Sequence, residues 1–313
     1  MEDALTELLK DATAGDPITG IKWTNKTLRN LSCQLKRRRV KVSYVTVRRL
    51  LRERGYRLRV NRKRLSKKLS PQRDRQMRYV AKFRNAFLKA GNPVISVDAK
   101  ERALMGNFKN AGRAWRQAAL DVLQDDYPSL ADGVAIPYGI YDVAHNHGWV
   151  MVGTAHQTPA FAIAAIHRWW LVRGRVMFPH AQELLIEADG GGANGYRSGL
   201  WHWGLQQLAD EFGLMITVTH LPTGASKWNL IEHRLFAFIS KNWAGHPLVS
   251  YETILKFIRT TKTQTGLRCQ AYLDRKVYKT GLKITPDQKA QINMTRHRVL
   301  PKWNYTIKPH AHC

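Results

Sequence analysis

The chain has 313 residues and carries 51 Lys and Arg against 23 Asp and Glu, which gives it a formal net charge of +28. Its length predicts two domains, and so large a cationic excess favours a polyanionic partner, first of all nucleic acid, over an acidic small molecule. There is no run of about 18 apolar residues and no basic-then-apolar amino terminus, and the three cysteines are too far apart for a disulfide framework, so we expect a cytoplasmic protein without a membrane partner.

The positive charge is concentrated in the first third of the chain. Residues 1–20 are acidic, and we interpret them as the remnant of a longer chain, whereas residues 21–90 hold 25 Lys and Arg but only two acids. Solvated helix faces normally mix both signs of charge. A stretch with one dominant sign therefore favours contact with nucleic acid.

Residues 21–70 are predicted to form a helix-turn-helix DNA-binding segment. Apolar residues recur at helical spacing before and after a run of basic residues: Leu28, Leu31 and Leu35, then Val42, Val45, Val47, Leu50 and Leu51. Ser43 is placed to cap the second helix, and Tyr56–Val60 alternates like a strand that would form a wing. The residues that we expect to contact DNA are Arg37, Arg38, Arg39, Tyr44, Arg48, Arg49 and Arg52. An ordinary helical hairpin is the alternative, and the one-sided charge favours DNA binding.

The rest of the chain is predicted to form a mixed α/β sheet. Residues 71–92 are interpreted as a helical linker, 93–265 as the domain that contains the sheet, and 266–313 as a basic carboxyl-terminal segment. Strands are expected at Val94–Val97, Ala135–Asp142, Trp149–Thr154, Glu183–Ala188 and Leu214–His220, and helices at Phe161–Trp170, at Trp201–Phe212 and after Asn229. Strands that come first and then alternate with helices favour a mixed sheet with helices packed on it.

Three acids stand where these elements begin or end. Asp98 and Asp189 follow strands, and the carboxyl ends of strands are where open α/β sheets usually bind ligands. Glu232 lies in the first turn of a helix, at the edge of its buried face. Carboxylates from separate elements suit Mg²⁺, and a pair of such ions can activate an attacking oxygen and stabilise the leaving one. Each acid alone is more often a cap or a surface charge, and Asn229 with Glu232 fits a capping box.

A glycine-rich run follows Asp189. Gly190 to Gly195 fits the pattern GxGxxG between a strand and a helix, which would indicate a dinucleotide site if an acid ended the next strand. The acids at that distance, Asp210 and Glu211, fall inside an amphipathic helix instead, and a dehydrogenase would leave the basic segment unexplained. We interpret the glycines as a sharp turn that lets a nucleic-acid strand approach.

Six stretches of sequence carry a family resemblance: Val94–Asp98, Gly106–Arg113, Ile136–Asp142, Ala188–Gly192, Ser226–Arg234 and Asn242–Gly245. With them, nearly the whole chain resembles bacterial insertion-sequence transposases of the ISAzo type. The resemblance implies a DDE active site on an RNase H-like fold, with Asp98, Asp189 and Glu232 as the catalytic acids and as ligands of Mg²⁺ or Mn²⁺. It also implies a homo-oligomer on double-stranded DNA and a location at the bacterial nucleoid.

Other residues of these motifs keep two interpretations. Lys227 and Asn229 are expected at the DNA, where they position a phosphate or the metal-binding helix, and a cap is an equal alternative for Asn229. Glu187 lies two residues before Asp189 on the same strand face and is interpreted as an ordinary polar residue of the sheet rather than a further metal ligand. Ala99 departs from the family, whose members often have a hydroxyl residue there.

The sequence therefore predicts an α/β fold, an RNase H-like mixed sheet with flanking helices, preceded by a small winged helix-turn-helix module. Its expected function is that of a DDE transposase, which cuts and joins the DNA of a mobile element. Two alternatives stay open: a catalytically inactive DNA-binding remnant or regulator, and an RNase H-like nuclease. Strand-transfer products would separate the transposase from the nuclease.

Overall fold

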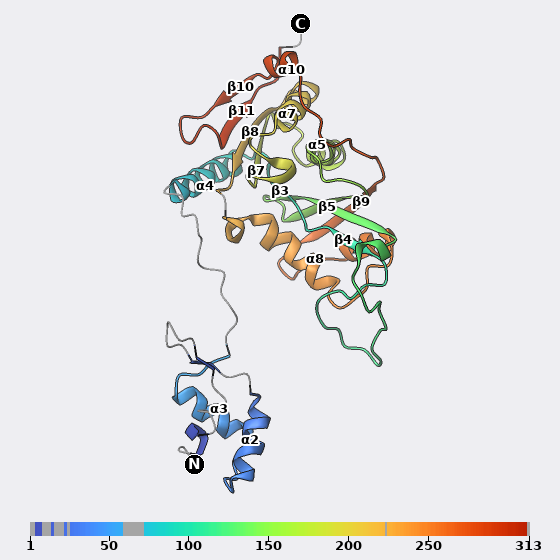
Figure 1. Cartoon of the computed structure of the whole chain (residues 1–313). Helices are drawn as coiled ribbons and strands as arrows, with labels where there is room; N and C mark the ends of the chain where they lie inside the picture. The colour runs from blue at the N-terminus through green and yellow to red at the C-terminus, as the bar shows by residue number, and fades with distance from the viewer. Residues whose placement is uncertain are drawn as a thin grey trace. The chain divides into compact units, whose positions relative to one another are not determined.

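The computed structural model describes residues 4–7, 14–15, 22–23, 26–58, 72–222 and 224–311. The chain divides into two compact units, Met1–Leu65 and Ser66–Cys313 (Figure 1). The end of the predicted wing, Arg59 and Val60, lies outside the described ranges.

The first unit is helical. It contains the short paired strands β1 (Ala14–Gly15) and β2 (Lys22–Trp23) and the helices α2 (Leu28–Arg37) and α3 (Tyr44–Glu53). The Ser43 hydroxyl caps α3 by accepting the backbone N–H of Thr46 at 3.1 Å. The apolar stripes of both helices meet in a small core of Leu5, Leu31, Leu35, Val47 and Leu50. The two predicted helices and the Ser43 cap are confirmed.

Two details of the first unit differ from the prediction. Val45, which we placed in the apolar pattern, is 49% exposed, because its neighbours Val47 and Leu50 form the buried stripe of α3. Residues 56–58 are not in a strand. The Arg57 guanidinium instead donates hydrogen bonds to the carbonyls of Arg52 and Tyr56, which keeps this stretch folded against the end of α3.

The second unit is built on a nine-stranded sheet in the order β10-β11-β8-β7-β3-β5-β6-β9, with β4 paired to β5. The strands are β3 (Val94–Ala99), β4 (Ala103–Met105), β5 (Gly133–Asp142), β6 (His147–Gly153), β7 (Glu183–Ala188), β8 (Met215–His220), β9 (Arg268–Asp274), β10 (Met294–Arg296) and β11 (Asn304–Ile307). Parallel and antiparallel pairs both occur, since β3 runs parallel to β7 and antiparallel to β5. The predicted mixed α/β sheet and its five predicted strands are confirmed.

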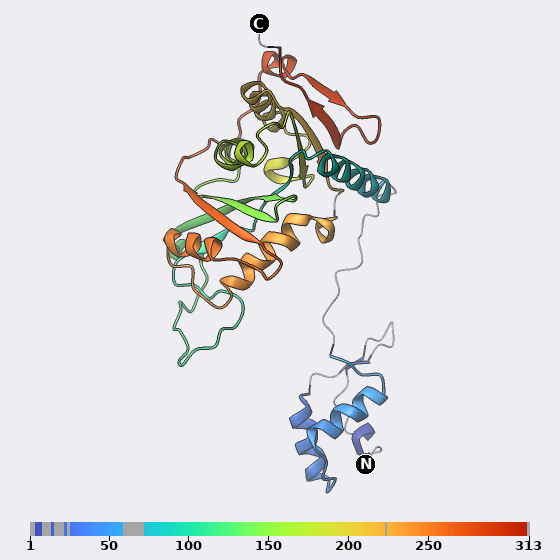
Figure 2. The same ribbon diagram turned by 180° about the vertical axis from the view of Figure 1, so that it is seen from behind.

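Helices cover both faces of this sheet (Figures 1 and 2). The helices α5 (Pro159–Trp169) and α7 (Gly199–Phe212) lie on one face, and α4 (Arg73–Lys89), α8 (Ala237–Asn242) and α9 (Tyr251–Arg259) lie on the other. Side chains alternate along a strand. Ile95 and Val97 of β3 therefore enter the core with α5 and α7, whereas Ser96 and Asp98 face the layer that contains α8.

Shorter helical segments connect these layers. They are η1 (Pro128–Leu130), the π-helical η2 (Trp170–Gly174), α6 (Arg175–Met177), η3 (Gly192–Asn194), η4 (Ser226–Trp228), the π-helical η5 (Glu232–Phe236) and α10 (Pro286–Ala290). Among the described helices, none is both long enough and apolar enough to cross a membrane.

Two segments that we predicted outside the sheet domain are built into the second unit. In the predicted linker, α4 packs on the sheet: the buried Gln76 amide donates to the carbonyl of His220 at 2.8 Å and to Asn304 Oδ1 at 2.7 Å. The predicted carboxyl-terminal segment supplies β9, β10 and β11. β10 and β11 are short, and β9 and β11 pair with strands far away in the sequence, so local periodicity gives a weak signal for this part of the sheet.

Candidate active site at the carboxyl ends of two parallel strands

Asp98 and Asp189 stand side by side at one edge of the sheet. In the parallel register of β3 and β7, Ser96 pairs with Glu187 and Val97 with Ala188. Asp98 and Asp189 are the next residues on each strand, and neighbouring strands lie roughly 4.8 Å apart. The structure thus brings these two predicted acids together.

The Asp98 carboxylate is held by two hydrogen bonds. Its Oδ1 accepts the N–H of Ala99 at 2.8 Å, and its Oδ2 accepts the side-chain amide of Asn229 at 2.7 Å. Burial raises the pKa of Asp98 to about 7, and the negative charges of Asp189 and Glu232 add to the effect. Burial and the two neighbouring acids thus disfavour the charged form of Asp98.

Asp189 is held by the loop that follows it. Burial raises the pKa of Asp189, the charge of Glu232 adds to this, and hydrogen bonds from Gly191 N–H and the Asn194 side chain oppose it. Asn194 is buried and in turn accepts the hydroxyl of Tyr138 at 2.6 Å. Gly192 has φ +61°, a left-handed conformation that favours glycine, which supports a sharp turn at this point.

Glu232 is the first residue of η5, in a helical stretch that continues into α8. The start of this stretch is tied to β3 by Ser96, whose hydroxyl donates to Asn229 Oδ1 at 3.2 Å and accepts the N–H of Ile231 at 3.4 Å. The Asn229 side chain thus forms hydrogen bonds with both Asp98 and Ser96. The oxygen that accepts the backbone N–H of Ile231 at the start of the helix is the Ser96 hydroxyl of β3. Asn229 is 2% exposed, so it lies beneath the site rather than on the surface.

Glu187 points to the same face as Asp189 but belongs to a different arrangement. Its carboxylate is buried and accepts two hydrogen bonds of 2.7 Å from the Arg84 guanidinium of α4. Glu187 therefore anchors a helix to the sheet, as expected of a structural residue.

A chain of hydrogen bonds between buried side chains ends at the backbone carbonyl of Asp189. His220 donates from Nδ1 to the Asp189 carbonyl at 2.8 Å, and its Nε2 accepts the Tyr305 hydroxyl at 3.2 Å. Tyr305 accepts the indole N–H of Trp201 at 2.9 Å. Burial lowers the pKa of His220 to about 4, which keeps the imidazole neutral and its tautomer fixed.

Several residues of this site were not predicted from the sequence. Tyr138, Asn194 and His220 act through contacts between distant segments, which no local pattern reveals. Lys100 could have been noticed, because it follows Asp98 by two residues. Burial lowers the pKa of Lys100, the charge of Glu232 opposes this, and its Nζ lies 5.3 Å from the ring centroid of Trp243.

The predicted metal ligands are near one another without being closed around an ion. Within the described ranges, no group of three His, Cys, Asp or Glu side chains is arranged to hold a metal ion. The chemistry of the donors still fits Mg²⁺ or Mn²⁺, because carboxylate oxygens are the ligands that these ions prefer, and repulsion from Asp189 and Glu232 helps to raise the pKa of Asp98. A divalent cation would offset that repulsion and draw the carboxylates closer.

The predicted DNA contacts fall into two groups. Arg37, Arg38, Arg39, Tyr44, Arg48, Arg49 and Arg52 are all exposed on the first unit. Two of them form ion pairs, Arg38 with Glu7 at 3.2 Å and Arg49 with Glu53 at 2.8 Å, and exposed pairs of this kind contribute little stability. In the second unit, Lys227 is exposed and its Nζ lies 5.7 Å from the ring centroid of Trp228.

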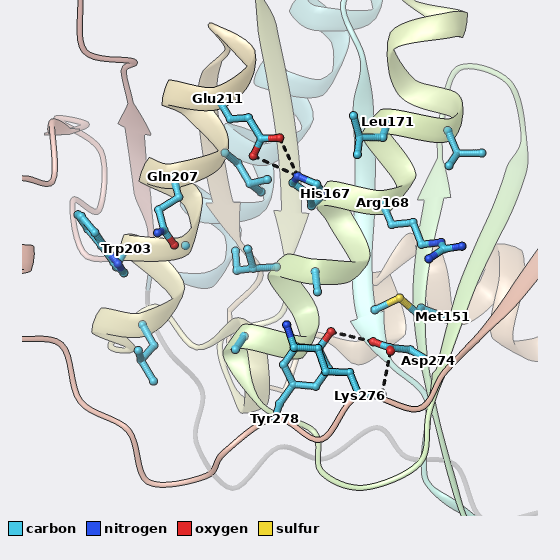
Figure 3. Close-up of a pocket in the computed structure, with 17 residues that line it drawn as sticks. Met151, His167, Arg168, Leu171, Trp203, Gln207, Glu211, Asp274, Lys276 and Tyr278 are labelled. Carbon is cyan, nitrogen blue, oxygen red and sulfur yellow. Dashed lines mark hydrogen bonds and ion pairs between the residues drawn. The ribbon is translucent and has the colours of Figure 1, made fainter.

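One hollow of the second unit, about 830 Å³, lies between α5 and α7 (Figure 3). Figure 3 shows Glu211 of α7 joined to His167 of α5, with Nε2 to Oε1 at 2.9 Å, and Tyr278 donating to Asp274 at 2.7 Å. Four of its polar side chains are thus paired with one another, and none of the three predicted acids lines it. The predicted acids therefore lie outside this hollow.

Comparison with known proteins agrees with the predicted class: the chain belongs to the DDE transposases. Within that class, it matches the family described as Rhodopirellula transposase DDE domain over residues 4–309. The chain is thus a DNA transposase, an enzyme that cuts and joins DNA.

Solved structures of Mos1 transposase are similar to this chain. The Mos1 paired-end complex with left transposon end is 15% identical at a TM-score of 0.45, over 82% of this chain and 69% of that one. The Mos1 strand transfer complex is 15% identical at a TM-score of 0.44, over 82% and 68%. No curated protein matches the chain.

Proposed function

We propose that Asp98, Asp189 and Glu232 are the catalytic acids of this transposase and that together they bind Mg²⁺ or Mn²⁺. The observation that carries the proposal is the electrostatics at the ends of β3 and β7, where burial, and after it the charges of Asp189 and Glu232, raise the pKa of Asp98 to about 7. The bound ions would supply an activated oxygen nucleophile and stabilise the leaving oxygen.

The chain's own residues orient two of the three acids, Asp98 and Asp189. Asn229 and the N–H of Ala99 hold the two oxygens of Asp98, and the loop after β7 holds Asp189 through Asn194. Groups fixed in this way keep the geometry needed for in-line attack on a phosphodiester. Lys227, exposed beside the start of the η5–α8 helix, provides a cation for a nearby DNA phosphate.

The first unit is proposed to bind double-stranded DNA as a helix-turn-helix module. Its exposed arginines and Tyr44 on α3 supply groups for phosphates and base edges. We also propose the finer features expected of the ISAzo type. They are an RNase H-like catalytic fold, a homo-oligomer on DNA and a location at the bacterial nucleoid.

A cleavage assay tests the three acids. Labelled DNA that carries the element's flanking repeats is incubated with Mg²⁺ and with the parent, Asp98→Asn, Asp189→Asn, Glu232→Gln or the control Asp125→Asn, which changes an exposed loop acid. We expect each site variant to lose at least about 100-fold in cleavage rate, since each removes charge that stabilises the transition state, and to bind the same DNA as tightly as the parent.

Two results would contradict the proposal. Cleavage that persists in all three site variants would place the chemistry elsewhere, and loss of DNA binding together with cleavage would make the acids structural. Joined products from the parent support a transposase, whereas cleavage without joining supports the nuclease alternative.

A further inference from the structure

A second hollow of the molecule, about 560 Å³, lies between the amino-terminal end of α7 and the carboxyl-terminal residues. Four cationic side chains line it: Arg197, Lys289, Arg296 and Lys302. Among the described residues, no acid lines it. The rest of the lining is aromatic or aliphatic, from Tyr196, Gly199, His202, Ile284 and Ile292.

The charge of these four side chains is not balanced locally. In the described part of the chain, none of them takes part in an ion pair, and the Arg296 guanidinium donates to a backbone carbonyl, that of Pro301, at 2.9 Å. Ordinary protein surfaces intersperse both signs of charge. Four cations around one hollow therefore indicate a site for an anion.

His202 adds an independent observation. It lies on the first turn of α7, is 8% exposed and lines the hollow, and its Nε2 is buried without a hydrogen-bond partner among the described residues. Leaving a buried polar atom unpaired destabilises the folded state. Unpaired groups of this kind occur where an ion, a water molecule or a ligand completes the site.

The hollow is connected to the candidate active site through Tyr196. The Tyr196 ring lines the hollow and stands edge-on to His220, with ring centroids 6.0 Å apart. His220 in turn donates to the carbonyl of Asp189. One wall of the hollow is thus two contacts away from the backbone of Asp189.

We propose that this hollow binds a backbone phosphate of the DNA strand that is processed at Asp98 and Asp189. The inference rests on the proposed function in taking that polyanion to be DNA. The phosphate contacts come from the guanidinium and ammonium groups, and the aromatic and aliphatic walls accommodate the adjoining sugar. The carboxyl-terminal residues thereby act as part of the DNA-binding surface as well as part of the sheet.

The test measures DNA binding in EDTA, where metal-dependent cleavage cannot occur, so its failure is distinct from failure of the catalytic acids. The full-length parent, Lys289→Gln and Arg296→Gln are titrated with a fluorescent duplex of mixed sequence at several salt concentrations. Lys256→Gln is the matched control, since it removes an exposed helical lysine on α9, which packs on the opposite face of the sheet.

Each pocket variant is expected to lower the slope of log affinity against log salt by about 0.9, the value for one phosphate contact. The slope measured for the control Lys256→Gln should differ from that of the parent by less than the slopes of the two pocket variants do. Unchanged slopes for both pocket variants, or an equal loss for Lys256→Gln, would overturn the proposal. A thermal shift caused by sodium pyrophosphate or ATP and lost in the variants, with unchanged DNA slopes, would identify a free phosphate compound as the ligand and also overturn it.

Discussion

Glu187 and Asp189 stand two residues apart on the same face of the sheet, yet their carboxylates meet opposite surroundings. Glu187 is 2% exposed and receives both of its hydrogen bonds from Arg84. Asp189 faces two further acids, and the charge of Glu232 helps to raise its pKa. Burial raises the pKa of Glu187 and its pairing with Arg84 opposes this, whereas no arginine or lysine pairs with Asp189 in the described part of the chain.

The difference shows that residue type and strand position do not decide the role of a buried acid. A buried carboxylate that pairs with a cation fixes two elements against each other, because losing either partner leaves a buried charge without compensation. Several neighbouring carboxylates without cationic partners destabilise the folded state. Such a group is retained where it has a function, such as binding an ion. Compensation by the surrounding residues is therefore the property that separates the two roles.

The largest expected effect comes from removing the partner of Glu187. Arg84→Met should lower the free energy of unfolding by about 3–5 kcal/mol, because it leaves a buried carboxylate without its cation. Urea denaturation of the parent and the variant measures the difference. The double variant Arg84→Met with Glu187→Met should recover most of the loss; if it is as unstable as the single variant, packing rather than charge holds α4 in place.

The second effect is the response of the acids to metal. Mg²⁺ should stabilise the parent by about 2.7 kcal/mol at a concentration of 100 times its dissociation constant, because the ion binds the folded state. Glu232→Gln should lose most of this gain, and in EDTA it should melt no lower than the parent, since one repulsive charge is gone. Thermal unfolding with and without Mg²⁺ measures both quantities. An equal Mg²⁺ response in parent and variant would remove Glu232 from the metal site.

The smallest expected effect concerns the orientation of Asp98. Asn229→Ala removes the amide that holds Oδ2 and should slow cleavage by about 10–100-fold, as expected for a residue that orients a metal ligand. The Mg²⁺ concentration for half-maximal rate should rise, and excess Mg²⁺ should restore part of the rate. Asn107→Ala, which changes an exposed loop amide, is the control. A slower rate with unchanged Mg²⁺ dependence would mean that Asn229 serves only the fold.

Local patterns were enough to predict the strands that carry the acids. Alternation places Asp98 opposite to Ile95 and Val97, and a strand that ends in an acid marks the edge of the sheet where ligands bind. The glycine turn after β7 was also predicted. The left-handed conformation of Gly192 depends on the residue type and not on contacts with distant residues.

The rest depends on contacts between residues far apart in the chain. Asn194 reaches Tyr138 across 56 residues, and Gln76 reaches Asn304 across 228. The same is true of Glu187, whose role depends on Arg84 in a segment that the sequence presented as a linker. Periodicity cannot reveal such pairs, because it reports only which face of an element is buried.

The last strands of the chain form both borders of the sheet, β9 beside β6 and β10 beyond β11. During synthesis on the ribosome, β6 and β8 must therefore wait for residues made much later, with Trp149 paired to Gln270 and Thr217 to Thr306. Pairings of such long range are slow to form. Until these residues are made, one edge of β6 and one edge of β8 stay unpaired, and unpaired strand edges favour aggregation.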